Sequence, residues 1–239
     1  MFPNRTAGPF YTRKGTTTMK SARVVQYSCL TFITLITGCV NTSALQTARA
    51  LEPGQQRILV GGGFYASPSV NASTSEMSSE DVSLSLPYVE LGYRRGIADR
   101  FELGAKITVP GTVGLDGKYQ FVNAGKFAVA AGLGAGYLKI SSGSDDSEVS
   151  TKLVDVTVPL YVSYDLASAF AVYASPKYVL RFASSSDASG MSSSATSSLA
   201  GATAGIRIGN RKGIFLETSY LKDVSSTFDS FQVNGSLYF

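Results

Sequence analysis

The end of the chain alternates strictly between two kinds of residue, and this pattern constrains the fold more than any other feature. One face of the segment carries Phe231, Val233, Gly235, Leu237 and Phe239, and the other carries Ser230, Gln232, Asn234, Ser236 and Tyr238. A period of two is that of a β-strand, because successive side chains of a strand point to opposite sides. The segment therefore predicts a strand with one face for an apolar medium and the other for a polar one.

Ten segments with strand character can be counted between turn-forming residues. They are residues 56–65, 84–95, 100–109, 113–122, 127–140, 153–165, 170–182, 199–208, 214–221 and 228–239. A strand needs only about 9 to 11 tilted residues to cross a bilayer. Short turns such as residues 96–99 alternate with other connections, three of which are long and polar. We predict an all-β fold, a transmembrane antiparallel up-and-down β-barrel of ten strands. Eight strands are the alternative if the Gly-rich first segment or the pair flanking Pro110 is not a strand.

The closing segment also ends on an aromatic residue, Phe239. An alternating last strand with this ending resembles the closing strand of Gram-negative outer-membrane β-barrels. The resemblance implies a bacterial outer-membrane location, periplasmic termini and extracellular long loops. It also implies recognition by the barrel-assembly machinery, for which the assembly signal is Phe231, Val233, Leu237 and Phe239.

The N-terminal part of the sequence has the layout of a secretory signal. Residues 1–18 show no apolar periodicity, which favours Met19 over Met1 as the start of the protein. After Met19, two basic residues, Lys20 and Arg23, precede an apolar stretch over residues 24–36. The stretch ends in Leu-Ile-Thr-Gly followed by Cys39, which resembles the lipobox of bacterial lipoproteins. The resemblance implies that residues 1–38 are removed and that Cys39 carries a covalent lipid, the only cofactor we expect.

This processing predicts three parts for the chain. They are a removed leader and signal peptide (1–38), a lipidated periplasmic tether (39–55) and the transmembrane barrel (56–239). The alternative is ordinary signal cleavage after Ala48-Arg49-Ala50, which fits the small-x-small rule but lies more than a dozen residues beyond the apolar stretch. Cys29 would be discarded with the signal in either case. If cleavage occurs before Cys39, Cys39 is the one cysteine left, so no disulfide can form within the mature chain.

Charge argues against a nucleic-acid partner. The precursor has 21 basic and 17 acidic residues, but residues 1–38 contain five of the basic ones and none of the acidic ones. The mature chain therefore has a net charge of −1. No basic excess is left for nucleic acid to bind.

Charged residues within the strands are expected to face the lumen. A Lys or Arg facing lipid at mid-membrane costs about 2 to 4 kcal/mol. The candidate lumen charges are Glu90, Arg94, Glu102, Lys106, Asp116, Lys118, Asp155, Lys177, Arg181, Arg207 and Glu217. A ten-stranded barrel is narrow, so these nearly balanced charges should pair and fill it.

The sequence favours a structural role over catalysis. Barrel enzymes of similar size, the omptin-like proteases among them, use a His in the active site, and this chain has no His. We expect no enzyme and no metal site. We expect a lipidated barrel that organises outer-membrane lipids or forms oligomers with itself or with other outer-membrane proteins. The alternatives are a narrow channel or small-anion binder that uses the charged lumen, and a surface receptor or adhesin that uses the Ser-rich loops at residues 66–82, 141–152 and 183–197.

Overall fold

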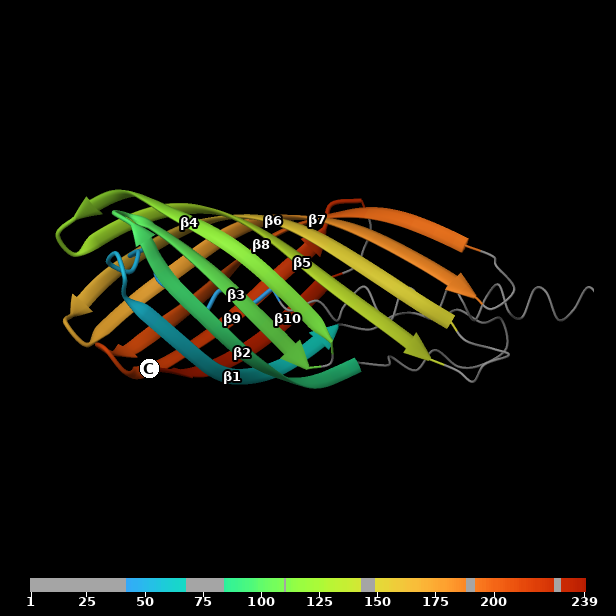
Figure 1. Cartoon of the computed structure of the whole chain (residues 1–239), viewed down its shortest axis with the longest axis horizontal. Coiled ribbons are helices and arrows are strands. Elements are labelled where there is room, and N and C mark those ends of the chain that lie inside the picture. The colour runs from blue at the N-terminus through green and yellow to red at the C-terminus, as the bar shows by residue number, and fades with distance from the viewer. Residues whose placement is uncertain (1–41, 68–83, 110, 143–148, 188–191, 226–228) are drawn as a thin grey trace, which may run out of the picture.

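Ten antiparallel strands form a closed barrel in the computed structural model, which describes residues 42–67, 84–109, 111–142, 149–187, 192–225 and 229–239 (Figure 1). The strands of this described part are β1 (Gln56–Ser67), β2 (Leu84–Ala98), β3 (Phe101–Val109), β4 (Thr112–Ala124), β5 (Phe127–Ser142), β6 (Val149–Ala167), β7 (Phe170–Asp187), β8 (Ser192–Gly209), β9 (Gly213–Asp223) and β10 (Asp229–Tyr238). Each strand pairs with the next along the chain, and β1 pairs with β10. The prediction of ten strands is confirmed, and the alternative of eight is wrong. The leader and Cys39 lie outside the described residues.

The first and last strands close the ladder. Gly62 of β1 lies opposite Gly235 of β10. The pairing continues past β10, because Ile58 and Phe239 exchange two backbone hydrogen bonds of 3.1 and 3.0 Å. A barrel has no free sheet edge, so every strand can satisfy its backbone within the protein.

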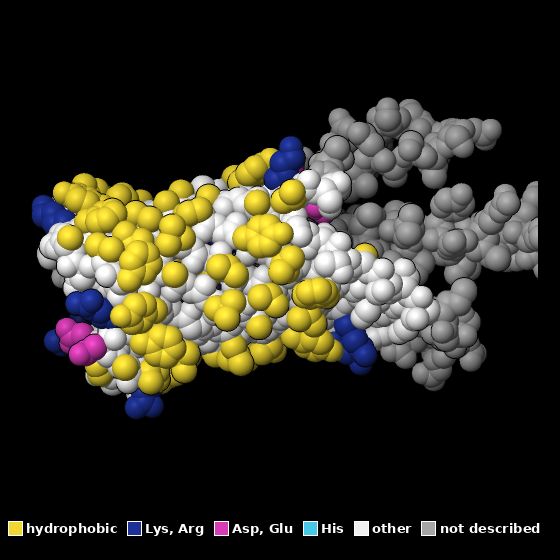
Figure 2. Space-filling view, turned by 90° about the horizontal axis from the view of Figure 1, so that it is seen from above, with side chains coloured by type: hydrophobic (Ala, Val, Ile, Leu, Met, Phe, Trp, Pro, Cys, Tyr) yellow, Lys and Arg dark blue, Asp and Glu magenta, His cyan; other side chains and the backbone are white. Residues whose placement is uncertain are grey.

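The outer wall is apolar along the length of the barrel. Leu115, Leu133 and Val158 are 64%, 61% and 51% exposed. Figure 2 shows hydrophobic side chains spread over the wall, with charged side chains gathered near its two ends. The assembly-signal side chains Phe231, Val233, Leu237 and Phe239 are all exposed on this face. Apolar residues outside and polar residues inside are the arrangement that a hydrocarbon surrounding favours.

The two ends of the barrel differ. The short-turn end holds the connections β2–β3, β4–β5, β6–β7 and β8–β9, together with the start of β1 and the C-terminus (Figure 1). Gly209 in one of these turns has φ +108°, and a Cβ there would lie 2.2 Å from the Lys212 carbonyl oxygen. The opposite, long-loop end holds the other five connections. No helix among the described residues is both long and apolar enough to cross a membrane.

The strands on one side extend further than the sequence predicts. Residues 183–197 were expected to form a loop, but β7 continues to Asp187 and β8 begins at Ser192, with Ser186 opposite Ser192. Residues 141–152 were likewise expected to be a loop, yet β5 runs to Ser142 and β6 starts at Val149. Backbone hydrogen bonding between neighbouring strands determines where these strands end, and serine side chains do not prevent this bonding. The wall formed by β6, β7 and β8 projects beyond β1–β4 at the long-loop end (Figure 1).

The described residues that precede β1 lie largely inside the barrel. We name residues 42–51 the luminal segment. It runs from the level of Gln232 in β10 to the short-turn end, where Gly54 and Gln55 hydrogen-bond to the backbone of Gly96. The chain then reverses into β1. Residues 39–55 are predicted from the sequence to form a periplasmic tether, but within that range the luminal segment lies inside the barrel.

Candidate functional site in the lumen

The luminal segment is an irregular chain without a strand partner, in which Leu45 has φ +43° and the chain bends at Ala48 and Arg49. Most of its residues are buried, and buried backbone N–H and C=O groups must find hydrogen-bond partners. The wall supplies them from side chains. The lumen is therefore a site that binds a peptide backbone.

Carboxylates of the wall accept hydrogen bonds from the backbone N–H groups. Glu217 in β9 accepts from Ala44 at 2.8 Å and from Leu45 at 2.7 Å, one bond on each carboxylate oxygen. Glu102 in β3 accepts from Leu51 at 2.8 Å. These are charge-assisted bonds, each worth about 1.5 to 3 kcal/mol.

Neutral side chains bind two further N–H groups. Ser163 Oγ accepts from Ala48 at 3.2 Å, and Gln120 Oε1 accepts from Ala50 at 2.9 Å. Together with the carboxylates, they hold the segment along almost all of its length.

Lysines of the wall donate to the backbone carbonyls. Lys118 in β4 donates to the carbonyl oxygens of Thr47 and Arg49 at 2.7 and 3.0 Å. Lys106 donates to the Ser43 carbonyl at 3.1 Å, and Lys177 donates to that of Thr42. The lumen thus presents negative or neutral acceptors to the N–H groups and positive donors to the C=O groups along one irregular chain.

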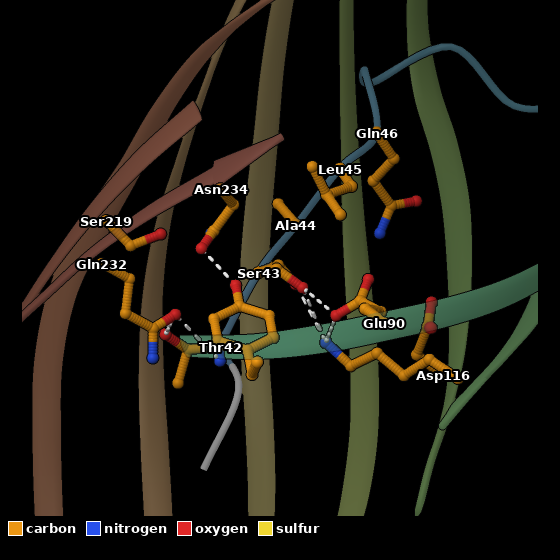
Figure 3. A network of polar contacts seen from close by, with 12 residues as sticks. Thr42, Ser43, Ala44, Leu45, Gln46, Glu90, Asp116, Ser219, Gln232 and Asn234 are labelled. Carbon is orange, nitrogen blue, oxygen red and sulfur yellow. Dashed lines mark hydrogen bonds and ion pairs between the residues drawn. The ribbon is translucent and has the colours of Figure 1, made fainter. Parts of the chain in front are cut away.

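The side chains of the segment add specific contacts. Ser43 Oγ donates to Glu90 Oε2 at 2.7 Å, beside Lys106, and Thr42 Oγ1 donates to Gln232 Oε1 at 3.2 Å (Figure 3). Near the short-turn end Arg49 forms an ion pair with Asp165. Because these contacts involve particular side chains of the segment, they determine its register along the lumen.

Apolar packing reinforces the polar contacts. Leu45 is 3% exposed and belongs to a cluster with Leu59, Tyr173, Phe215 and Tyr238. Within this cluster the Phe215 and Tyr238 rings lie 4.9 Å apart. An aliphatic side chain thus fills the lumen at the level of an aromatic layer.

A second cluster packs around Ala48. Ala48, Ala128, Ala130 and Tyr161 are all buried together. Gln46 Nε2 donates to the Tyr161 hydroxyl at 2.7 Å. The small residues of β5 leave room here for the segment to pass close to the wall.

The remaining charges pair with one another. Arg94 binds Glu102 at 2.7 Å and Asp116 at 2.6 Å, and both contacts are ion pairs. Gly104 makes room for this crossing, because a Cβ there would lie 2.6 Å from Arg94 Nη1 and 2.7 Å from Asp116 Oδ1. Lys118 completes the group at 3.1 Å from Glu102.

A separate pair lies on the longer wall. Arg181 Nε and Nη2 each lie 2.9 Å from an Asp155 oxygen, the two-pronged geometry of strong guanidinium–carboxylate pairs. Both side chains are almost fully buried. This pair is satisfied without the luminal segment.

All the predicted lumen charges point inward, but they do not all pair as expected. Eight of the eleven are buried and the others are partly buried: Glu90, Arg94, Glu102, Lys118, Asp155, Lys177, Arg181 and Glu217 are buried, and Lys106, Asp116 and Arg207 are partly so. Arg207 forms an ion pair at 3.4 Å with Asp165, a residue that was not in the predicted set of lumen charges. Lys177 and Glu217 bind the luminal segment instead of an opposite charge in that set.

Sequence reasoning did not place Arg57 or the luminal segment in the lumen. Arg57 has its guanidinium carbon 5.0 Å from the Tyr238 ring centre, a cation–π contact. Alternation alone places Tyr161 and Tyr238 on the inward face, so strand parity was a usable signal for the aromatic layer. The luminal segment gave no such signal, because its sequence shows neither strand nor helix periodicity.

Little free space remains around residues 42–46 of the segment. A cavity of about 90 Å³ separates it from β2–β6, with Glu90, Arg94, Lys106, Asp116, Tyr161 and Lys177 among its lining residues. This space suits a few ordered waters. Among the described residues no group of three or more His, Cys, Asp or Glu could hold a metal ion.

A closed antiparallel barrel with an apolar outer wall and a charged lumen defines a transmembrane β-barrel. No family model and no curated protein matches the sequence. Solved barrels with a similar fold include Ail of Yersinia pestis (TM-score 0.43, 13% identity, 77% of this chain and 99% of Ail) and the outer-membrane protease OmpT of Escherichia coli (0.42, 11%, 80% and 98%). Neisserial surface protein A is another (0.39, 11%, 76% and 95%).

Proposed function

We propose that the protein is a bacterial outer-membrane barrel that is closed by its own N-terminal segment and serves a structural, lipid-organising role. The luminal segment is the observation that carries the proposal. Short turns at one end, longer connections at the other and an apolar wall support the outer-membrane location. The exposed apolar wall offers the surface for outer-membrane lipids and for neighbouring proteins, a second copy included.

The charges that could have served an anion path are engaged. Lys106 and Lys177 donate to backbone carbonyls of the segment, and Arg181 is paired with Asp155. An ion that entered the lumen would have to displace a bound chain. This supports a closed barrel over an open channel.

A channel opened by release of the segment is the second candidate. The observation that favours it is the mode of binding. Side chains hold the segment, and no strand ladder joins it to the wall, so it can leave without breaking the barrel. The luminal segment would then be a gate.

Single-channel recording of the purified, folded full chain in planar bilayers separates the two. A structural barrel with a bound segment gives no steady conductance. Brief openings that lengthen when the segment is weakened would favour the gated channel. Steady conductance from the wild-type chain would contradict both.

The lipid-organising role needs a test in cells. We expect deletion of the gene in the source bacterium to raise the entry of an apolar dye across the outer membrane, and the wild-type gene to restore the barrier. A second complementing gene carries Cys39→Ala, which removes the proposed acylation site and tests whether a lipid on this residue contributes to the barrier. An intact barrier in the deletion strain would contradict the role.

A further inference from the structure

An open pocket lies at the short-turn end, beside the mouth of the lumen. It has a volume of about 540 Å³ and is lined by the β4–β5 and β6–β7 turns, by Arg207 of β8 and by Arg49 of the luminal segment. Its charged side chains are those of Arg49, Lys126, Arg207 and Asp165. Three positive charges around one negative charge leave the pocket with a positive excess of two.

Arg207 lacks a full set of partners in this pocket. Its side chain is 11% exposed, and its described hydrogen bonds both come from Nη2, at 3.4 Å, to Asp165 Oδ1 and to the Ser168 carbonyl. Its Nε is buried and has no partner among the described residues. A guanidinium has five N–H donors, and leaving donors of a charged group unpaired costs free energy. Arg207 therefore has donors left for a ligand with several acceptor oxygens.

The other two cations differ in how they are held. Arg49 is anchored, because its Nε pairs with Asp165, its Nη1 donates to Asn123 Oδ1 at 2.6 Å and its Nη2 donates to the Gly125 carbonyl. Lys126 is exposed, and its ammonium group has no hydrogen bond or ion pair to any other residue that the structure describes. Asp165 thus serves mainly Arg49, and the charges of Lys126 and Arg207 remain available for a ligand.

The surroundings of the pocket favour an anion. The four turns of the short-turn end carry four basic residues, Arg100, Lys126, Arg211 and Lys212, against one acidic residue, Asp99. A hollow under positive potential concentrates small anions. Arginine matches the oxygens of a phosphate group with two parallel hydrogen bonds, and lysine binds the group as a point charge. A phosphate group with two negative charges balances the excess in the pocket, whereas a single carboxylate neutralises only half of it.

We propose that this pocket binds a phosphate group and that the bound phosphate strengthens the docking of the luminal segment. Arg49 belongs to the segment, whereas Lys126 and Arg207 belong to the wall. The site has all three cations only while the segment is docked, so phosphate binds the docked form more tightly. By linkage, phosphate then shifts the equilibrium toward docking. The proposal rests on the docked segment of the structure and on neither of the two functions proposed above.

Isothermal titration calorimetry with inorganic phosphate tests the site in the folded full chain, held in phosphatidylcholine nanodiscs. We expect saturable binding with a Kd of about 1 mM or tighter, as two charge-assisted hydrogen bonds at an open site allow. Lys126→Gln and Arg207→Gln are each expected to weaken binding by about tenfold, the effect of one such bond. Lys212→Gln is the matched control, because it removes a charge from the same end without touching the pocket, and we expect it to leave the affinity nearly unchanged.

Absence of saturable binding by the wild type would overturn the site. Equal weakening by Lys212→Gln would overturn it too, because general surface charge would then explain the binding. Phosphatidic acid added to the nanodisc tests the source of the phosphate group, with oleate as a lipid of like charge that lacks phosphate. Competition by phosphatidic acid but not by oleate assigns the site to a lipid headgroup, and equal affinities in the two nanodiscs assign it to a soluble phosphate.

Protease cleavage within residues 42–51 measures the coupling between the site and the segment. We expect phosphate, at the concentration that saturates the wild type, to slow this cleavage in the wild type and in Lys212→Gln but not in Lys126→Gln. Heat-modifiable migration on gels shows that each variant is folded. A cleavage rate that phosphate leaves unchanged in the wild type would overturn the coupling.

Discussion

Glu217 is the strongest single attachment of the luminal segment, and Glu217→Gln tests how the lumen is held shut. Its Oε1 accepts from Ala44 N and Asn234 Nδ2, and its Oε2 accepts from Leu45 N and the Tyr173 hydroxyl, at 2.7 to 2.9 Å. A glutamine keeps the shape but offers only one acceptor oxygen. Its amide NH2 must then face one of the two pairs of donors.

The cost follows from the number of bonds lost. Each Glu217 oxygen accepts one bond from the segment and one from the wall, so the docked segment loses one charge-assisted bond, worth about 1.5 to 3 kcal/mol. This cost acts on the docked segment, so the ratio of released to docked segment rises by roughly 10- to 100-fold, since about 1.4 kcal/mol corresponds to a factor of ten. The barrel ladder itself is unchanged.

Single-channel recording measures this ratio as the fraction of time spent open. We expect Glu217→Gln to show repeated openings where the wild type is silent. Glu52→Gln is the matched control, because Glu52 is exposed outside the lumen and its carboxylate binds Gln55, 2.9 Å away. A folded Glu217→Gln barrel as silent as the wild type, or equal openings in Glu52→Gln, would refute the reasoning.

Three further changes probe the packing, the charge network and the assembly signal. Leu45→Ala opens a void in the aromatic layer, and we expect a loss of about 2 to 5 kcal/mol in the docking of the segment, seen as faster protease cleavage within residues 42–51 of the folded barrel; unchanged cleavage would contradict the packing argument. Arg94→Met leaves Glu102 and Asp116 without their shared partner, and we expect the free energy of unfolding in urea to fall by about 3 to 5 kcal/mol; an unchanged urea midpoint would show that water or Lys118 compensates. Phe239→Ala is expected to lower the yield of assembled barrel in cells while leaving the urea midpoint of the refolded protein within about 1 kcal/mol; equal yields would remove the terminal aromatic from the assembly signal.

The barrel could be predicted because each strand carries its own evidence. Alternation in the segment that ends at Phe239 fixes both its faces and its position, and the cost of a lipid-facing charge assigns Glu90 and Arg181 to the lumen. These are local signals that need no knowledge of the partner strand. The observed strands therefore begin and end close to the predicted ones, apart from the Ser-rich extensions.

The luminal segment could not be predicted in the same way. Its ten residues have no alternation, and the groups that hold it come from strands far along the chain, such as Glu217 in β9. Charge pairing within the lumen was a reasonable expectation for Arg94, but it does not reveal that Lys118 also serves a backbone carbonyl. Only the folded barrel brings these groups around one chain.

The position of the luminal segment directly before β1 has a consequence for how the protein folds. The seam between β1 and β10 joins the two ends of the barrel sequence, so the ring cannot close until the last strand is made. The segment must lie between the strands before this seam forms, or else thread afterward through a lumen that side chains already crowd. Refolding of the isolated chain should accordingly yield two populations, one closed around its segment and one closed without it, and the second should convert to the first only slowly, because the seam must open again.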